Sequence, residues 1–362
     1  MTVPRTTTPA LPPPRRTVLV TGASGVVGTA LLPRLAADGS DPERPASRVV
    51  ALVHRSAVEG RSVTSVRGDI TAPRLGLSVR EYDALTRRVD AVVHAAAVTV
   101  FKGRDDALHR TNVDGTRQVL RFAEDAQAPL YHVSTAFLHP AKTSAPTRSA
   151  IGYAVSKAAA EDLVKHSGVP HSIVRPSIVI GDSRTGAISM FQGIYQVAES
   201  ILEGNLPLLP LGPGWTLDLI PCDLVADAVA DLVATAGTGR ELWLTAGDRA
   251  LTMDDATKVL TEHAASTGSP ISRPRFVDPD IFDRLIAPAF LPELPAPMAA
   301  AVNRLMDLFH DYLALDEPFT SSVPELEARG VLRLPDSREA FRASLAYWAA
   351  AVGRTSRAVA VA

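Results

Sequence analysis

Near its N-terminus the chain reads Arg16-Thr17-Val18-Leu19-Val20-Thr21-Gly22-Ala23-Ser24-Gly25-Val26-Val27-Gly28, a short apolar, β-branched run followed by three glycines spaced three residues apart. Leucines continue at helical spacing beyond this loop. Strand, glycine loop and helix in this order predict a dinucleotide-binding unit. In such a unit Gly22 permits the tight turn, Gly25 lets the backbone approach a pyrophosphate, and Gly28 lets the helix close on the strand. Pro33 falls inside the expected helix and predicts a kink or a shift of register.

Further apolar runs predict additional strands at 48–53, 89–93, 131–135, 171–175 and 241–245. We therefore expect an α/β fold, with a Rossmann doubly wound parallel sheet covered by helices on both faces and a smaller C-terminal substrate lobe. The predicted organisation is a disordered leader at 1–15, a nucleotide-binding core at 16–180, a lobe that makes up most of 181–352, and a frayed tail at 353–362. The strand at 241–245 is expected to return to the main sheet.

The residues after the second predicted strand indicate the type of dinucleotide. That strand ends in His54-Arg55, where an NAD-binding chain would carry an acidic residue for the ribose hydroxyls. A guanidinium at this point suits a 2′-phosphate, which favours NADPH, although a surface role for Arg55 stays open. Arg34 is a candidate second ligand.

Other cofactor contacts are expected where later strands end. Asp69, in Gly68-Asp69-Ile70, is placed to accept a hydrogen bond from the adenine amino group, and the small side chains of Ala95-Ala96-Ala97 after His94 would let the cofactor lie against the strand end. The predicted cofactor residues up to this point are Thr21, Gly22, Ser24, Gly25, Val26, Val27, Gly28, His54, Arg55, Asp69, Ile70, Ala95, Ala96 and Ala97.

Tyr153 and Lys157 lie four residues apart in Gly152-Tyr153-Ala154-Val155-Ser156-Lys157. On a helix this spacing puts both side chains on one face, where an ammonium can lower the pKa of a phenol and make it a usable acid. Two hydroxyls, Ser134 and Thr135, follow the predicted fifth strand. Asn112 opens a predicted helix, where it either anchors a water for proton return or has only a structural role at the helix start.

Together these residues resemble the extended short-chain dehydrogenase/reductase family over most of the chain. The matching motifs are Thr-Gly-x-x-Gly-x-x-Gly at 21–28, Gly68-Asp69, His94-Ala95-Ala96, Asn112 with Gly115-Thr116, Ser134-Thr135, Tyr153 with Lys157, and Arg175-Pro176. The resemblance implies an NADP-dependent oxidoreductase in which Tyr153, Lys157 and Thr135 are catalytic, with Ser134 as the less favoured hydroxyl. It also implies that Tyr153, Lys157, Arg175, Pro176, Ser177 and Ile178 contact the cofactor, and that a homodimer forms through the helix containing Tyr153 and the helix before it.

Three segments are similar to the thioester reductase and fatty acyl-CoA reductase branch, at 173–186, 217–226 and 318–322. This resemblance implies that NADPH reduces an acyl thioester, carried by coenzyme A or by an acyl carrier protein, to an aldehyde or alcohol. The segment from Ala136 to Gly152 is shorter than in acyl reductases, so no preference for acyl chain length follows.

Two other classes of function stay open. A ketone or aldehyde reductase, or a sugar-nucleotide epimerase or dehydratase, would use the same catalytic residues, and the sugar-nucleotide enzymes would need cations such as Arg273, Arg275 and Arg304 for a diphosphate. The second class is a regulator that binds NADP without turning it over, but such proteins typically lack the tyrosine and lysine.

Composition narrows the remaining classes. The chain has 362 residues, 46% of them hydrophobic, and a formal net charge of −2, and it has no basic run with interleaved aromatics, so nucleic acid is not an expected partner. The single cysteine, Cys222, predicts an inert buried thiol and a reducing, cytoplasmic setting. Neither a signal peptide nor a membrane span is expected, and the scattered histidines do not predict a metal site.

Overall fold

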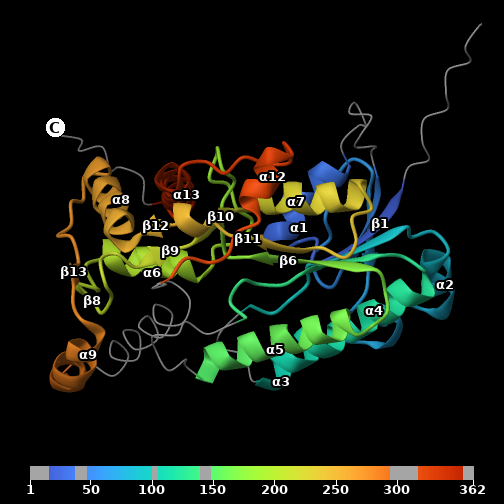
Figure 1. Ribbon diagram of the computed structural model, residues 1–362, viewed down its shortest axis with the longest axis horizontal. Coiled ribbons are helices and arrows are strands. Elements are labelled where there is room, and N and C mark those ends of the chain that lie inside the picture. Colours follow the sequence, from blue (N-terminus) through green and yellow to red (C-terminus); the bar gives the residue numbers. More distant parts are fainter. Residues whose placement is uncertain (1–15, 37–46, 100–104, 139–147, 294–316, 354–362) are drawn as a thin grey trace, which may run out of the picture.

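The computed structural model describes residues 16–36, 47–99, 105–138, 148–293 and 317–353. Its centre is a seven-stranded sheet in the order β11-β6-β5-β4-β1-β2-β3, in which every paired strand is parallel (Figure 1). The strands are β1 (Thr17–Thr21), β2 (Arg48–Val53), β3 (Val63–Arg67), β4 (Ala91–His94), β5 (Leu130–Val133), β6 (His171–Pro176) and β11 (Glu241–Leu244). The chain changes direction across the sheet between β1 and β4, which is where such sheets bind ligands. This is the predicted doubly wound α/β fold.

Helices cover both faces of the sheet, which explains why the inner strands are almost continuously apolar. One face carries α2 (Val79–Thr86), α4 (Gly115–Asp125) and α5 (Arg148–Lys165), and the other carries α1 (Val26–Leu35) and α7 (Cys222–Ala234) (Figure 1). Residues 105–125 form one continuous helical run, from α3 (Asp105–Leu108) through a π-helical segment (His109–Asp114) into α4. Asn112 therefore lies inside a helix, and its predicted place at a helix start is wrong.

The position of α7 corrects the predicted division of the chain. It packs closely along α1, and Arg34 Nε donates to Asp227 Oδ1 at 2.5 Å. Although α7 falls within the stretch assigned mainly to the substrate lobe, it therefore completes the helical layer of the nucleotide-binding core. The same contact commits Arg34 to α7, so its predicted role at a 2′-phosphate is wrong.

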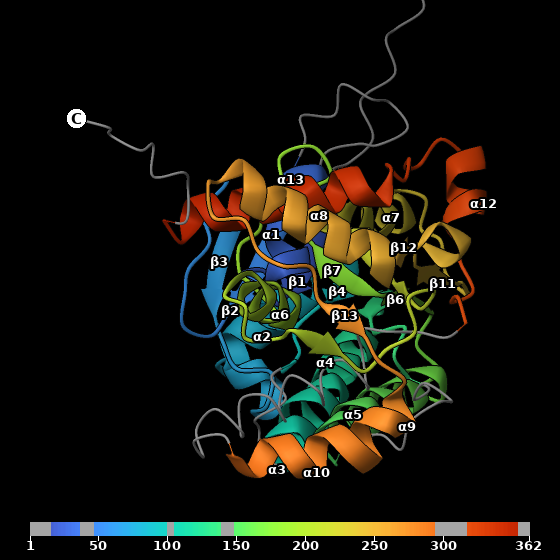
Figure 2. The same ribbon diagram turned by 90° about the vertical axis from the view of Figure 1, so that its left-hand side faces the viewer.

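The smaller lobe joins the end of the sheet near β7 (Ile178–Ile180), on the left in Figure 1 and facing the viewer in Figure 2. Its strands are β8 (Leu208–Leu209), β9 (Thr216–Leu217), β10 (Leu219–Pro221), β12 (Leu251–Thr252) and β13 (Arg275–Phe276). Its helices are α6 (Gly193–Leu202), α8 (Met253–Ser266), α9 (Pro279–Ile281) and α10 (Ala287–Phe290). The chain then adds α12 (Val323–Ala328) and α13 (Ser337–Ala351) on the side of α7 and α8.

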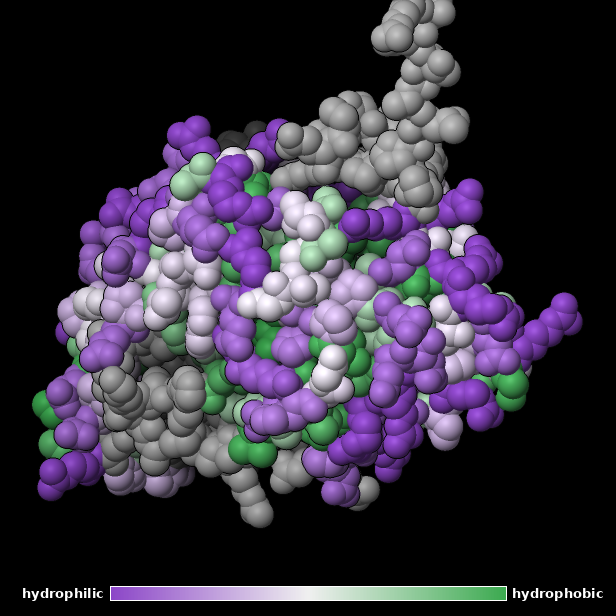
Figure 3. Space-filling model, turned by 45° about the vertical axis from the view of Figure 1, so that its right-hand side comes forward, coloured by the Kyte–Doolittle hydropathy of each residue, from purple (hydrophilic) through white to green (hydrophobic). Residues whose placement is uncertain are grey.

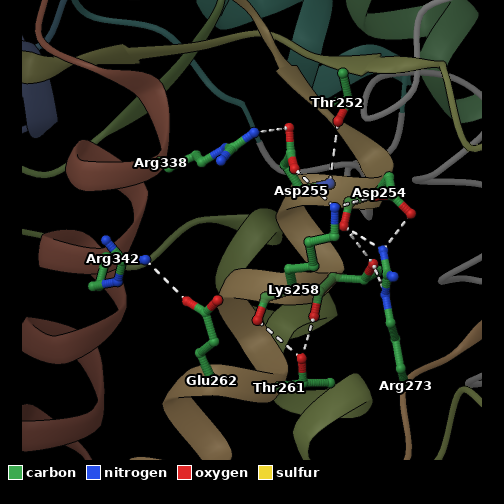
Figure 4. Close-up of polar contacts among 10 residues, drawn as sticks. Thr252, Asp254, Asp255, Lys258, Thr261, Glu262, Arg273, Arg338 and Arg342 are labelled. Carbon is green, nitrogen blue, oxygen red and sulfur yellow. Dashed lines mark hydrogen bonds and ion pairs between the residues drawn. The ribbon is translucent and has the colours of Figure 1, made fainter.

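Ion pairs connect α13 to α8 across this lobe (Figure 4). Arg338 Nη2 lies 2.7 Å from Asp255 Oδ2, and Arg342 Nη2 lies 2.9 Å from Glu262 Oε2. These ion pairs flank an apolar contact. On the α13 side this contact contains the buried side chains of Phe341, Leu345 and Trp348. Pairs as exposed as Arg342–Glu262 contribute little stability individually.

Two local predictions, those for Pro33 and for Cys222, can be compared with the structure. Helix α1 continues through the exposed Pro33 and ends two residues later, so the proline lies in the last turn, where only one backbone hydrogen bond is lost. Cys222 is buried, as predicted, and burial raises the pKa of its thiol to about 12, so the reactive thiolate is disfavoured. The predicted leader and nearly all of the predicted tail lie outside the described residues.

The face shown in Figure 3 is mainly hydrophilic, with small and separated hydrophobic areas. Among the described residues, none of the helices combines the length and the apolar character that crossing a bilayer requires.

Candidate active site

The glycine loop between β1 and α1 is shaped by backbone contacts at two of its glycines. Gly22 has φ of +71°, and a Cβ there would lie 2.5 Å from the carbonyl carbon of Ala95. A Cβ on Gly28 would lie only 2.2 Å from the carbonyl oxygen of Gly22. On Gly25 the nearest atom would be that same oxygen at 3.2 Å, so Gly25 is crowded on one side only. The loop thus leaves the N-terminus of α1 open to a phosphate, and it fits a dinucleotide.

A buried hydrogen-bond chain joins this loop to the helical run that contains Asn112. Thr21 Oγ1 lies 2.7 Å from His94 Nδ1, and His94 Nε2 lies 3.0 Å from Thr116 Oγ1. Thr116 donates its only hydroxyl proton to the carbonyl of Asn112 at 2.6 Å, so the imidazole must donate from Nε2 and accept from Thr21 at Nδ1. Burial lowers the pKa of His94 to about 3, and the ring is therefore neutral.

The predicted adenosine end of the site has one ordered carboxylate. The Asp69 Oδ1 atom accepts hydrogen bonds from the backbone N–H and the hydroxyl of Thr71, both at 2.8 Å, while Oδ2 lies 4.0 Å from His54 Nε2. The backbone N–H of Asp69 donates to the carbonyl of Leu75, whose φ of +56° is unusual for a leucine. Arg55 is exposed just beyond β2. The structure thus brings His54 and Asp69 close together at this edge.

Tyr153 and Lys157 lie on α5 and are both buried. Burial raises the pKa of the Tyr153 phenol to about 12, against the opposing effect of a hydrogen bond with Thr135. We expected Lys157 to lower this pKa, but its Nζ instead donates to the carbonyl of Val133 at 2.9 Å. Burial lowers the pKa of Lys157 to about 8. In this state the phenol carries its proton at neutral pH, as a general acid must.

The two hydroxyls after β5 differ in their surroundings. Thr135 is hydrogen bonded to Tyr153, and its Oγ1 also accepts from the N–H of Phe137 at 3.3 Å. Ser134 is equally buried, but its hydroxyl has no partner among the described residues. This arrangement favours Thr135 over Ser134 as the hydroxyl that works with Tyr153.

The Asn112 side chain is taken up by protein groups. It accepts from Val98 N at 2.8 Å and donates to Val98 O at 3.2 Å and to Ser156 Oγ at 3.0 Å. Ser156 Oγ in turn donates to the carbonyl of Tyr153 at 2.8 Å. The amide of Asn112 therefore links the segment after β4 to the turn of α5 that carries Tyr153, and its contact with a water stays a prediction.

Arg175 also has a different place from the predicted one. Its guanidinium donates to both carboxylate oxygens of Glu161, at 2.8 and 2.6 Å, and to Glu241 at 2.7 Å. These contacts assign Arg175 to α5 and β11, and its predicted contact with the cofactor is wrong for the side chain. Pro176 ends β6 and Ser177 follows it, so both lie at the carboxyl edge of the sheet.

Sequence reasoning missed an apolar cluster around Tyr153. The cluster comprises Tyr153, Leu108 and Phe137, with Val98, Ile178 and Phe319 packed against it. The rings of Phe137 and Phe319 meet edge to face, with their centroids 5.2 Å apart. These residues come from six separate segments. Apart from Tyr153, only Ile178 in the noted 173–186 segment and Phe319 in the noted 318–322 segment could have pointed to the cluster. No group of histidine, cysteine and acidic side chains suited to a metal occurs in the described part of the chain.

The comparisons with known proteins agree with this geometry. The sequence model described as "Male sterility protein" matches residues 20–229, more than half of the chain and all of the segments that contain Tyr153, Lys157 and the glycine loop. The chain belongs to the male sterility protein family. This family consists of NAD(P)-dependent oxidoreductases of the extended short-chain dehydrogenase/reductase type, so the protein is an enzyme that uses a nicotinamide dinucleotide.

Two curated relatives of this family member are multidomain synthetases. A hybrid PKS-NRPS synthetase, pvhA, from Talaromyces variabilis is 31% identical over 60% of the chain and 6% of that protein. An isonitrile lipopeptide synthase from Streptomyces coeruleorubidus is 30% identical over 59% of the chain and 16% of that protein. The chain therefore spans a small part of the length of these relatives. The terminal R domain from the myxalamid PKS-NRPS biosynthetic pathway has the same fold, with a TM-score of 0.73 and 24% identity over 93% of this chain and 91% of that one.

Proposed function

We propose that the protein is an NADPH-dependent thioester reductase, which converts an acyl thioester to the aldehyde, or further to the alcohol, and releases the thiol. The observation that carries this proposal is the apolar cluster of Leu108, Phe137 and Phe319 around Tyr153. An acyl chain needs apolar side chains next to the acid that protonates its carbonyl oxygen, and this cluster supplies them. The synthetase relatives support a carrier protein as the thiol component.

The protein groups support each step of the reduction. Thr135 and Tyr153 would hold the thioester carbonyl oxygen, since their side chains are hydrogen bonded to each other. NADPH supplies the hydride that adds to the carbonyl carbon. As negative charge develops on the oxygen, the protonated phenol of Tyr153 transfers its proton there and the resulting hemithioacetal loses the thiol to leave the aldehyde. The Lys157 ammonium would bind the nicotinamide ribose from the same face of α5 as Tyr153.

The proposed preference for NADPH over NADH depends on Arg55. Its guanidinium is exposed at the carboxyl end of β2, where the ribose of an adenosine unit lies in this fold. The neighbouring carboxylate, Asp69, is already held by Thr71 and lies on the next loop along the sheet edge. A cation without an acidic residue directly after β2 favours the 2′-phosphate of NADPH.

The contacts of the candidate arginines in the lobe weaken the alternative hypothesis of a sugar-nucleotide enzyme. Arg273, one of its candidate diphosphate ligands, donates from Nε to Thr257 Oγ1 at 2.9 Å and lies 2.5 Å from Asp254 (Figure 4). Arg304, the third candidate, lies outside the described residues. Among the described candidates this leaves Arg275, which is exposed, and a single arginine is a weak basis for a diphosphate site.

The test is NADPH oxidation, followed by absorbance, with acyl groups presented on coenzyme A, on a pantetheine thiol and on a carrier protein, and with the matched free aldehydes and ketones. We expect consumption with thioesters that is abolished in Tyr153→Phe, with cofactor binding retained. Tyr347→Phe, which removes a hydroxyl from a partly exposed tyrosine on α13, is the matched control. Consumption with aldehydes or ketones alone would overturn the thioester assignment.

A further inference from the structure

Glu161 lies one helical turn after Lys157 on α5, and both side chains are almost completely buried. The carboxylate of Glu161 is held by the fork of Arg175, with Nε–Oε1 at 2.8 Å and Nη2–Oε2 at 2.6 Å. Arg175 is on β6, which lies between β5 and the edge strand β11. Two parallel N–H···O bonds fix both the separation and the relative orientation of the two groups.

The pair is part of a closed ring of four charged side chains. Arg175 Nη2 also lies 2.7 Å from Glu241 Oε2, and Lys165 Nζ lies 3.2 Å from Glu241 Oε1 and 3.5 Å from Glu161 Oε2. The guanidinium carbon of Arg175 lies 4.8 Å from the ring centroid of Trp243, the residue that faces Arg175 on β11. The ring therefore connects α5 to β6 and β11 at one point.

The contacts of this charged ring restrict the position of the Lys157 side chain. The ammonium of Lys157 donates to the carbonyl of Val133 at the end of β5, while the turn below it is fixed to β6 through Glu161. A helix held to two neighbouring strands at successive turns can neither rotate about its axis nor slide along the sheet. Because a buried ion pair adds little net stability over an apolar contact, geometry is the effect to expect of it.

We propose that Glu161 and Arg175 are positioning residues for Lys157, which fix the ammonium at the cofactor site. The proposal rests on the role for Lys157 given in the proposed function. Neither Glu161 nor Arg175 touches the reacting groups, so both act through Lys157.

The charges around Lys157 give the pH dependence. Burial lowers the pKa of Lys157 to about 8, and the carboxylate of Glu161 opposes this effect. The other titratable groups near it are Tyr153 one turn earlier on α5, His94 on β4 and His132 on β5, all of which burial keeps neutral, and Arg175 on β6, which is cationic. Glu161 is thus the anion that favours the protonated lysine. Since the ammonium is lost as pH rises through its pKa, removing Glu161 must move that loss to lower pH.

The experiment compares Glu161→Gln with Arg175→Lys. In Glu161→Gln the amide still accepts a hydrogen bond from Arg175, but the charge is gone, and we expect the alkaline limb of the kcat profile to move to lower pH by roughly one unit. In Arg175→Lys the charge near Lys157 is kept and the two-bond fork is lost. There we expect kcat to fall about tenfold through misplacement of Lys157, with the alkaline limb unmoved. Glu262→Gln, which breaks the exposed pair with Arg342, is the matched control (Figure 4).

A second readout needs no substrate. NADPH binding, measured by fluorescence between pH 6 and pH 10, should lose affinity at lower pH in Glu161→Gln than in the wild type, and thermal unfolding should show that all variants are folded. If the limbs of Glu161→Gln and wild type coincide in both assays while its unfolding temperature falls, Glu161 is merely structural and the proposal is overturned. If no thioester is reduced but the binding curves separate, the proposed function fails and the positioning role stands.

Discussion

Replacing Gly28 with alanine is expected to weaken cofactor binding and stability together, because this glycine is where α1 touches the loop that it follows. A Cβ at this position would lie 2.2 Å from Gly22 O and 2.6 Å from the Cα of Ala23. Real Cβ contacts are almost never shorter than 3.0 Å, so the helix must retreat by at least 0.8 Å, which is 3.0 minus 2.2. Both obstructing atoms belong to the backbone, so no rotamer change relieves the overlap.

The size of the effect follows from two opposing contributions. Overpacking against a rigid neighbour costs about 1–3 kcal/mol, while alanine gains up to about 1 kcal/mol over glycine inside a helix. Because both obstructing atoms are backbone, we take the upper end of that cost, about 3 kcal/mol, and after the gain of about 1 kcal/mol we expect Gly28→Ala to lower the free energy of unfolding by about 2 kcal/mol. Because retreat of α1 also moves its N-terminal N–H groups away from the phosphate site, we expect NADPH affinity to fall roughly tenfold.

Chemical denaturation followed by circular dichroism measures the first quantity, and fluorescence titration with NADPH measures the second. Gly214→Ala is the matched control, since Gly214 has no positive φ and a Cβ there meets nothing within 4 Å. Gly28→Ala with the stability and affinity of the wild type would refute the claim that this contact holds helix and loop together. A loss of stability with unchanged affinity would refute the link between helix position and phosphate binding.

Three further predictions concern individual side chains. Thr135→Val should lower kcat by about a hundredfold, because the hydroxyl bonded to Tyr153 is lost, whereas Ser134→Ala should stay within about threefold; equal losses would contradict the assignment of Thr135. Arg55→Gln should raise Kd for NADPH about tenfold and leave Kd for NADH unchanged, with Arg61→Gln, another exposed arginine, as the control; parallel weakening would remove Arg55 from the phosphate site. Phe319→Ala should raise KM for long-chain thioesters more than for acetyl thioesters, and a uniform change would show that its ring does not line the acyl site.

The sheet and its glycine loop were predictable because their signals are local. The run at 48–53 is β2 residue for residue, and the loop between Thr21 and Gly28 connects β1 to α1 as its glycines indicate. The place of α7 was not predictable in this way. Whether this helix covers the core sheet or the lobe depends on α1, nearly 200 residues earlier in the chain.

The site shows the same division between local and distant information. The spacing of Tyr153 and Lys157 placed both side chains on one helix, and the structure buries them together. Their pKa relation was wrong, because the desolvation of the phenol depends on Leu108 and Phe137, which arrive from other segments. Arg175 was misread for a related reason. The Arg175-Pro176 motif identifies the arginine, but it does not show the partners of that arginine. These partners, Glu161 and Glu241, come from two other elements.

The packing of α7 on α1 has a consequence for the order in which the molecule can fold during synthesis. When the ribosome has made residues 16–180, the chain already contains the whole nucleotide loop, Tyr153 and Lys157, yet α1 still exposes the side that α7 will cover, and the sheet still lacks β11. The cofactor site can therefore reach its final rigidity only after about 60 more residues have emerged, at typical rates several seconds later. Cutting the chain at the end of β7 would not yield a small NADP-binding protein but a sheet with an open edge and an uncovered helix.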